Sequence, residues 1–424
     1  MSALDDALAR ARARFVADNP ASRAAHERAA AHLPGGNTRT TLFYPPFPLT
    51  MARAEGSRLT DLDGHTYVDL LGDYTAGLYG HDHPVIRKAV EGALDRGWNY
   101  GAHNTDEALL AGVLCERFPS LELVRFTNSG TEANLLALAT ATTYTGRDTI
   151  LVFTGAYHGS VLSFGDRDFP LNVPHRFVVA EYNDLADTTA VLDRYADDLA
   201  AILVEPVLGS GGCLPADPAF LAFLRRRADE TGALLVFDEV MTSRMSGGGM
   251  QELLGITPDL TTLGKYTGGG MTFGAFGGRA DVMAMYDPRR PGYVAHAGTF
   301  NNNVLSMAAG YAGLTQLFPP PAARELFDRG ERLRARLNEI AEGTPMTWTG
   351  MGSMLTVHFG TGEIRTPRDM RPAPEYRELF HLEMLARGFH LARRGMIALS
   401  LAVSNEECDA FCAAVADFTA HWNV

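Results

Sequence analysis

The length, composition and charge of the chain limit the class of protein that it can form. Its 424 residues, 46% of them hydrophobic, suffice for one large globular domain and a smaller one. The formal net charge of -13 argues against nucleic acid as a partner, because phosphate binding needs Lys and Arg gathered on one face.

The cysteines and the apolar segments give no sign of export, a membrane span or a metal site. Four scattered cysteines are too few for a disulfide framework and suit a reducing compartment. Cys408 and Cys412 lie one helical turn apart, but no second pair and no His cluster accompanies them. The N-terminus lacks the apolar core of a secretory signal, and no run of about 18 apolar residues occurs. We therefore expect a cytoplasmic protein that binds neither a membrane nor a metal.

The N-terminal region is predicted to form helix and then a β-hairpin. Residues 1–34 are rich in Ala and Arg and end at the helix breaker Pro34-Gly-Gly-Asn. An irregular segment, 38–48, follows. Across residues 58–70 apolar and polar side chains alternate around Asp63-Gly, which is the strongest short-range signal for a hairpin.

The middle of the chain, from about residue 80 to 310, alternates short apolar runs with helical patterns. Near-continuous apolar runs are typical of strands buried on both faces, and they occur at 123–126, 149–153, 200–204 and 233–237. Helical patterns such as 217–231 lie between them. This alternation is the βαβ pattern and predicts an α/β fold with a mostly parallel sheet.

The C-terminal part differs in composition from the middle of the chain. Pro319-Pro-Pro-Ala is followed by a charged helical pattern over 324–342 and a strand-like run over 353–359. A helix, a strand and a final helix come after that run. We expect these elements to form a separate α+β region.

A candidate phosphate site follows the first of the apolar runs. A Ser129-Gly-Thr turn comes after Phe126, and an Ala- and Leu-rich helix then begins. Free N–H groups and the positive end of the helix dipole favour an anion there, and the hydroxyls can add hydrogen bonds. An ordinary N-cap explains the same residues. The chain has neither a Walker A sequence nor a G-x-G-x-x-G after a strand.

Two further motifs lie where strands end. Asp238 and Glu239 terminate the apolar run 234–237, and the carboxyl ends of parallel strands are where such sheets bind ligands. A capping or ion-paired carboxylate is the alternative. Lys265 follows a short strand and precedes three glycines. A lysine partly buried in a cleft is destabilised as a cation and becomes a nucleophile for a carbonyl, whereas a solvated lysine has no such role.

Together the three motifs supply what pyridoxal 5'-phosphate (PLP) needs. The lysine amine forms an exchangeable Schiff base with the cofactor aldehyde, a carboxylate keeps the pyridine nitrogen protonated, and a cup of donors anchors the phosphate. The motifs follow one another in that α/β region of the chain. We therefore predict that the chain binds PLP.

Six segments resemble those of class III PLP aminotransferases of fold type I, and the resemblance extends over essentially the whole chain. They are Asn128-Ser-Gly-Thr-Glu-Ala, Tyr157-His-Gly, Val204-Glu-Pro, Phe237-Asp-Glu-Val, Thr262-Leu-Gly-Lys and Gly298-Thr-Phe. The resemblance implies a large PLP-binding domain over 76–312. It also implies a smaller α+β domain built from the terminal segments 1–75 and 313–424.

The resemblance also implies roles for individual residues. Lys265 would carry the Schiff base and then act as the base, and Asp238 would pair with the pyridine nitrogen. The remaining cofactor contacts would be the phosphate cup Ser129, Gly130 and Thr131, Tyr157 and Val240 on the two ring faces, and Thr299. In this family Thr299 would reach the phosphate of the neighbouring subunit, which implies a homodimer with shared active sites. His158 is expected to be structural, and Glu205 to lie near the cofactor without an assigned role.

Two kinds of relative compete for the reaction. Glutamate-1-semialdehyde aminomutases usually carry Gly-Thr-x-x-Gly-Asn-Pro, where this chain has Gly298-Thr-Phe-Asn-Asn-Asn. The segment 35–48 resembles the β-phenylalanine aminotransferases more closely. We therefore favour transamination of an aromatic β-amino acid such as β-phenylalanine, with 2-oxoglutarate or pyruvate as the acceptor. The aminomutase is the alternative, and a non-catalytic PLP-binding protein is disfavoured because every cofactor contact is present.

Two arginines are candidates for binding the substrate carboxylates. A guanidinium offers a bidentate, permanently charged partner, and Arg39 in the irregular segment is the candidate for the β-amino acid. Arg394 matches a family position that serves the acceptor, with Arg393 beside it as the alternative. Four aromatic residues either line a substrate pocket or belong to the core: Phe43, Tyr44, Phe47 and Tyr74.

Overall fold

The computed structural model describes residues 3–165 and 169–421 and divides into two compact units. Unit 1 comprises Met1–His83, Asp328–Glu363 and Met370–Val424, and unit 2 comprises Pro84–Phe327 and Ile364–Asp369. Both main limits lie later in the chain than residues 75 and 312. The second one falls within the helix that follows Pro319. Compactness alone does not define a domain, so the domain limits stay a prediction.

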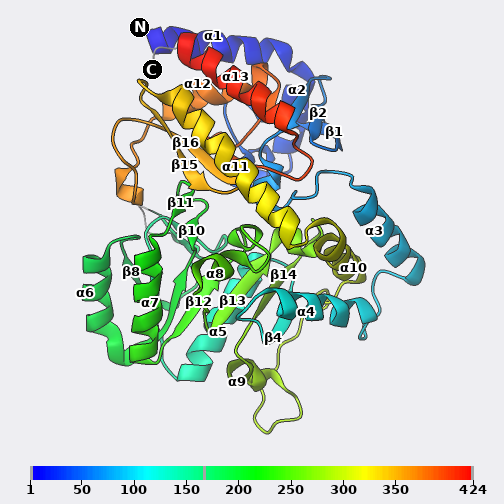
Figure 1. Cartoon of the computed structure of the whole chain (residues 1–424). Coiled ribbons are helices and arrows are strands. Elements are labelled where there is room, and N and C mark those ends of the chain that lie inside the picture. The colour runs from blue at the N-terminus through cyan, green and yellow to red at the C-terminus, as the bar shows by residue number, and fades with distance from the viewer. Residues whose placement is uncertain (1–2, 166–168, 422–424) are drawn as a thin grey trace. The chain divides into compact units, whose positions relative to one another are not determined.

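Unit 2 is built around a seven-stranded sheet with the order β4-β14-β13-β12-β9-β5-β8 (Figure 1). Neighbouring strands are parallel except for β14, which runs antiparallel to both β13 and β4. The strands are β4 (Leu123–Thr127), β5 (Thr149–Phe153), β8 (Arg176–Ala180), β9 (Leu199–Val204), β12 (Leu234–Asp238), β13 (Leu260–Gly264) and β14 (Gly274–Gly278). The predicted mostly parallel sheet is confirmed.

The helices of unit 2 follow the predicted alternation with the strands. They are α3 (Pro84–Arg96), α4 (Thr105–Arg117), α5 (Gly130–Thr145), α6 (Leu185–Tyr195), α7 (Pro218–Thr231), α8 (Gly249–Leu254), α9 (Ala280–Met283) and α10 (Val304–Ala312). Local signals fix their ends. For example, the Asp217 carboxylate accepts the N–H of Ala219 at the start of α7, and Gly232 ends that helix in the left-handed region. Two short hairpins, β6 (Ala156–Tyr157) with β7 (Ser163–Phe164) and β10 (Val207–Leu208) with β11 (Leu214–Pro215), complete the unit.

Unit 1 joins the two terminal parts of the chain. The hairpin β2 (Arg58–Asp61) and β3 (Thr66–Asp69) forms as predicted, and β1 (Met51–Glu55) pairs with β2 while β17 (Phe389–His390) pairs with β3. A second sheet contains β15 (Met346–Met351), β16 (Met354–Phe359) and β18 (Met396–Ala398). The helices are α1 (Ala3–Asp18), α2 (Pro20–Ala30), α11 (Pro320–Ala341, which begins in unit 2), α12 (Pro374–Ala386) and α13 (Asn405–His421). None of the helices within 3–165 and 169–421 is long and apolar enough to cross a membrane.

The carboxylate of Asp259 connects three elements of unit 2. One oxygen accepts the backbone N–H of Leu235 in β12 at 2.8 Å. The same carboxylate pairs with Arg225 of α7 and with Arg279, which precedes α9, at 2.8 Å each. Because Asp259 is buried, the removal of its side chain leaves the N–H of Leu235 without its acceptor, and Arg225 and Arg279 keep only their second carboxylate partners, Asp229 and Asp281.

We expect Asp259→Ala to lower the free energy of unfolding by about 3 kcal/mol, as measured by urea denaturation. Asp259→Asn is the matched control. Its amide oxygen can still accept the N–H of Leu235, so it should cost less than the alanine variant. Equal stability of Asp259→Ala and the unmodified protein would contradict this account of the fold.

Candidate active site

The predicted phosphate cup lies at the N-terminus of α5. Ser129 is the N-cap, with extended backbone, and its hydroxyl accepts the N–H of Glu132 at 3.2 Å. The N–H groups of Gly130 and Thr131 in the first turn have no acceptor within a helix. Together with the helix dipole they favour an anion at this point. Ser129 therefore caps the helix, and the turn also offers donors for a phosphate.

Four chain segments converge at this helix start. A Cβ on Gly130 would lie 2.8 Å from Val240, and Gly264 at the end of β13 is close enough that its Cβ would lie 3.5 Å from Gly130. Gly159 has φ of +129°, and a Cβ there would lie 2.2 Å from Thr131. Side chains are thus excluded where the segments approach most closely. The glycines bring the helix start, the loop after β6, the loop after β12 and the end of β13 together.

The buried carboxylate of Asp238 is held by three donors. Its Oδ2 accepts Nδ2 of Asn134 at 2.8 Å and pairs with Nδ1 of His158 at 2.7 Å, and its Oδ1 accepts the N–H of Val240 at 3.0 Å. The hydroxyl of Thr262 donates to Oδ1 of Asn134 at 2.8 Å and fixes that amide in turn. These contacts fix the orientation of the Asp238 carboxylate. His158, which was expected to be structural, thus holds the Asp238 carboxylate.

Glu205 is also buried and connects the two short hairpins, β6–β7 and β10–β11. Its oxygens accept the backbone N–H of Tyr157 and of Gly209, both at 2.9 Å. Burial raises the pKa of Glu205 to about 7, the nearby His158 and the two N–H donors act against the rise, and Asp238 adds to it. The side chain of Tyr157 is 43% exposed, so its ring has a free face for a ligand. Glu205 thus positions the backbone that carries this ring.

Lys265 has a strained backbone at the place where chemistry was predicted. It follows β13 directly and has φ of 60°, a left-handed conformation that residues other than glycine rarely adopt. Its side chain is partly buried. Strain of this kind persists where the surrounding structure imposes it, and it gathers at functional sites. The short strand predicted before Lys265 is present.

Thr299 lies in an exposed turn of unit 2. Nδ2 of Asn128, next to the phosphate cup, donates to Oδ1 of Asn301 in this turn at 3.0 Å. Among the described residues, no contact of Thr299 with the cup of its own chain is seen. A hollow of about 470 Å³ lies beside the turn, and its lining includes Arg125, His296 and Asn301.

The predicted carboxylate-binding residues belong to unit 1. Arg39 pairs with Asp73 at 3.0 Å, and the guanidinium carbons of Arg39 and Arg394 lie 5.7 and 5.0 Å from the ring centre of Tyr74. Arg393 instead pairs with buried Glu378 at 3.2 Å. The structure therefore brings Arg39, Arg394 and Tyr74 together.

The other predicted aromatic residues divide between core and surface. Tyr44 and Phe47 are buried and pack against Phe15, with ring centres 6.2 and 5.2 Å apart. Phe43 is exposed. The core explanation therefore holds for Tyr44 and Phe47.

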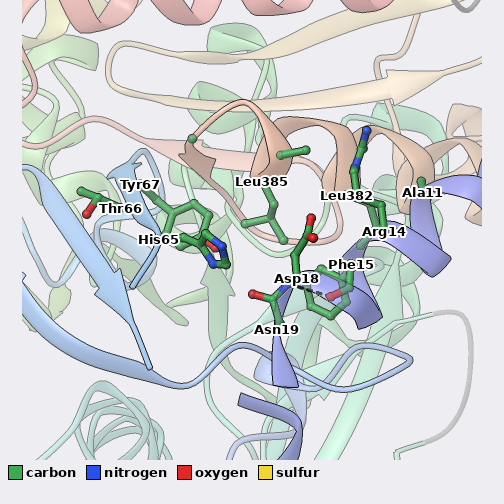
Figure 2. Close-up of a pocket in the computed structure, with 12 residues that line it drawn as sticks. Ala11, Arg14, Phe15, Asp18, Asn19, His65, Thr66, Tyr67, Leu382 and Leu385 are labelled. Atoms are coloured by element: carbon green, nitrogen blue, oxygen red, sulfur yellow. Dashed lines mark hydrogen bonds between the residues drawn. The ribbon is translucent and has the colours of Figure 1, made fainter. Parts of the chain in front are cut away.

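A hollow of about 350 Å³ in unit 1 lies between α1, the β2–β3 hairpin and α12, as Figure 2 shows. None of the predicted site residues lines it. Its lining is partly apolar, with Phe15, Leu382 and Leu385, and Arg14 at its edge is paired with Glu383 of α12 at 2.7 Å. We assign no role in catalysis to this hollow.

Sequence reasoning missed Asn134 and did not find a partner for Glu205. Asn134 is a buried polar residue one helical turn after Gly130 in a helix rich in Ala and Leu. A polar residue at that place in an apolar helix is a signal that could have pointed to it, because a buried amide needs hydrogen-bond partners. The contacts of Glu205 are made by backbone N–H groups, which leave no mark in the sequence.

Glu205 should make stability depend on pH. The folded protein keeps the Glu205 proton up to about pH 7, whereas a glutamate with the ordinary pKa of 4.5 releases its proton at lower pH. Between these values the folded state binds more protons, so the free energy of unfolding falls as pH rises, by at most about 1.4 kcal/mol per pH unit. Glu205→Gln should remove this decline in urea denaturation at pH 5, 6 and 7, and the exposed Glu27→Gln should retain it. Identical pH slopes in all three proteins would refute the buried titration.

The convergent groups of unit 2 fit PLP. The start of α5 presents free N–H donors. Because Gly130 has no Cβ, the side chain of Val240 can pack directly against the backbone of Gly130. Three hydrogen bonds fix the carboxylate of Asp238 in place, as a partner for a protonated ring nitrogen must be. Lys265 is partly buried and directly follows Gly264, which is one of the convergent residues. It supplies the amine.

Comparisons with known proteins agree with this fit. The family model for class III aminotransferases matches residues 43–418. A β-phenylalanine transaminase from Variovorax paradoxus is 52% identical over 420 residues, covering 98% of this chain and 96% of its own. The crystal structure of a β-phenylalanine aminotransferase from the same organism superposes with a TM-score of 0.98 and covers 99% of this chain and 98% of its own, at 52% identity.

Two further relatives extend the comparison. A glutamate-1-semialdehyde 2,1-aminomutase from Sorangium cellulosum is 40% identical over 396 residues and covers 88% of this chain and 89% of its own. A solved transaminase with PLP bound is 32% identical, with a TM-score of 0.87, and covers 95% of this chain and 98% of its own. The chain therefore belongs to the class III aminotransferases and is a PLP-dependent enzyme of fold type I.

Proposed function

We propose that this aminotransferase moves the amino group of an aromatic β-amino acid, such as β-phenylalanine, to a keto acid such as 2-oxoglutarate or pyruvate. The observation that carries the proposal is the 52% identity, over 98% of the chain, to a protein named as a β-phenylalanine transaminase. The two guanidiniums beside Tyr74 support it, since both the donor and the acceptor bring a carboxylate.

In this proposal the residues of unit 2 hold the cofactor. PLP, when bound, supplies an electron sink for the carbon that carries the substrate amine. Ser129, Gly130 and Thr131 bind its phosphate, and Asp238 holds the proton of its ring nitrogen. Lys265 would hold the cofactor covalently until the amine of the substrate takes its place. The lysine amine released in that exchange would then accept the proton from the amine-bearing carbon of the substrate.

Two further cofactor contacts are proposed on the faces of the ring. Tyr157 stacks on one face with the free side of its own ring, and Val240 packs on the other. Val240 is well placed for this role, because it lies next to Gly130 and its N–H anchors Asp238. Glu205 helps to position Tyr157, because its carboxyl group accepts the backbone N–H of that residue.

The two arginines of unit 1 would bind the two substrates. Arg39 binds the carboxylate of the β-amino acid, which lies one carbon further from the amine than in an α-amino acid. Arg394, rather than Arg393, binds the carboxylate of the acceptor. Arg393 already pairs with Glu378, whereas within the described ranges Arg394 has no carboxylate partner and its buried Nε donates to nothing. A buried unpaired donor is costly, so a carboxylate ligand would relieve it.

A homodimer with shared active sites is part of the proposal. Thr299 lies in an exposed turn next to Phe300, which is 54% exposed. Aromatic residues are enriched at protein–protein interfaces, so the exposed ring of Phe300 beside Thr299 supports a partner subunit at this turn. Thr299 would then contribute to the phosphate site of the second copy. The cytoplasmic location stays a prediction.

The substrate proposal is tested by a panel of amino acids and keto acids. We expect the purified enzyme to turn over β-phenylalanine only when 2-oxoglutarate or pyruvate is added, because the amino group needs an external acceptor. Activity toward α-phenylalanine should be lower. Conversion of glutamate 1-semialdehyde without any added keto acid would instead favour the aminomutase, which the 40% identical relative keeps as the second candidate.

Lys265→Ala tests the role of the lysine. The variant should still bind PLP through the phosphate cup but lose the absorbance of the covalent linkage, and its turnover should fall by about 10³-fold or more. Borohydride should fix the cofactor on the peptide that contains residue 265 in the unmodified enzyme. Lys88→Ala, at an exposed position of α3, is the control and should keep both properties. Trapping of PLP on another residue would overturn the assignment.

A further inference from the structure

A strained turn of unit 1 carries Asp73 and Tyr74. The turn spans Gly72–Thr75, and three residues in succession that are not glycine have positive φ: Asp73 at 43°, Tyr74 at 53° and Thr75 at 79°. Such residues rarely enter this region, and each one costs free energy. A run of three in a surface turn indicates that the surrounding structure holds the turn in this form.

The buried carboxylate of Asp69 holds the turn by hydrogen bonds to its backbone. Its Oδ1 accepts the N–H groups of Leu71 and Gly72 at 2.9 and 3.1 Å. Its oxygens also pair with Nε2 of His81 at 2.9 Å and Nδ1 of His390 at 3.4 Å. Burial acts to raise the pKa of Asp69, but these imidazoles hold it well below its usual range. The hydrogen bonds of the Asp69 carboxylate therefore hold the turn in its strained conformation.

The fixed turn places the ring of Tyr74 beside two cations. The guanidinium carbon of Arg394 lies 5.0 Å from the ring centre and that of Arg39 lies 5.7 Å from it. The Tyr74 hydroxyl donates to the carbonyl of Thr41 at 3.2 Å, which fixes the ring. The face of an aromatic ring attracts cations, so one ring can keep two guanidiniums near each other despite their repulsion.

Asp73 provides a carboxylate for only one of the two guanidiniums. Its Oδ1 lies 3.0 Å from Nη1 of Arg39, and the side chains are 55% and 47% exposed. A single exposed contact of this kind is weak and exchanges readily with ligands from solution. A substrate carboxylate can bind the same guanidinium through two parallel hydrogen bonds, which is the stronger arrangement. The substrate and Asp73 thus need the same group.

We propose that Asp73 is a built-in competitor for the substrate carboxylate at Arg39. It pairs with Arg39 when no amino acid is bound and yields the guanidinium when one binds. The apparent affinity for the β-amino acid is then lower than the intrinsic affinity of Arg39, in proportion to the fraction of Arg39 that is not paired with Asp73. This inference rests on the proposed role of Arg39 in binding that carboxylate.

Asp73→Asn tests the competition. Asparagine tolerates the left-handed backbone better than most residues and cannot form the ion pair. In the PLP-bound enzyme we expect KM for β-phenylalanine to fall by about three- to fivefold, with kcat nearly unchanged, because the competing pair is worth a fraction of a tenfold change. The dissociation constant of 3-phenylpropanoate, a carboxylate without an amine, should fall by the same factor in calorimetry.

Two controls guard the result against unrelated effects. Glu27→Gln removes the exposed partner of Arg23, a pair at 2.9 Å on α2, and should leave both constants unchanged. Asp73→Gly suits the positive φ as well and also removes the carboxylate, so it should reproduce the effect of Asp73→Asn. Should Asp73→Asn fold poorly, as judged by its thermal midpoint, the glycine variant decides the question.

Arg39→Ala separates the failure of this inference from that of the proposed function. If Arg39→Ala leaves KM for β-phenylalanine unchanged, the proposed role of Arg39 is wrong. If it raises KM at least tenfold while neither Asp73 variant lowers KM, the role of Arg39 stands and the competition is overturned. The competition also requires that Asp73→Asn has no effect once Arg39 is alanine. An equal fall in KM in that background would overturn it as well.

Discussion

Asp238 ends a buried strand with a carboxylate that solvent scarcely reaches, so its charge has to be balanced by hydrogen bonds from the protein. The donors come from three places: Asn134 on α5, His158 after β6, and the N–H of Val240. Each donor belongs to a segment that also carries a proposed cofactor contact. The requirement to satisfy one buried charge therefore fixes the helix of the phosphate cup and the loop of Tyr157 relative to the end of β12.

The parts of this arrangement that depend on local pattern could be predicted from the sequence. Apolar runs marked β4, β5, β9 and β12, because strands covered on both faces are almost continuously apolar. A small polar turn before an Ala-rich stretch marked the start of α5, since capping is a matter of neighbouring residues. The positions of Asp238 and Lys265 after strands followed from the same patterns. Their order along the chain then pointed to PLP.

The parts that depend on distant partners could not be predicted. Asn134 and Asp238 are 104 positions apart, and His158 and Asp238 are 80 apart, so no local pattern signals either bond. The positive φ values of Asp73 and Tyr74 were equally hidden, because a Gly-Asp-Tyr-Thr sequence favours no such run of left-handed residues. They follow from the anchor at Asp69 and its two histidines, and one of these, His390, comes from the other end of the chain.

The two units differ in how they hold their charged groups. Unit 2 buries the carboxylates of Asp238 and Glu205 and surrounds them with N–H donors from its own backbone and side chains. Unit 1 holds the guanidiniums of Arg39 and Arg394 near one ring, with exposed Asp73 as a weak partner for one of them. Fixed donors suit a resident cofactor, which has to keep one orientation through every turnover. A weak and exchangeable partner suits substrates, whose carboxylates have to arrive and leave.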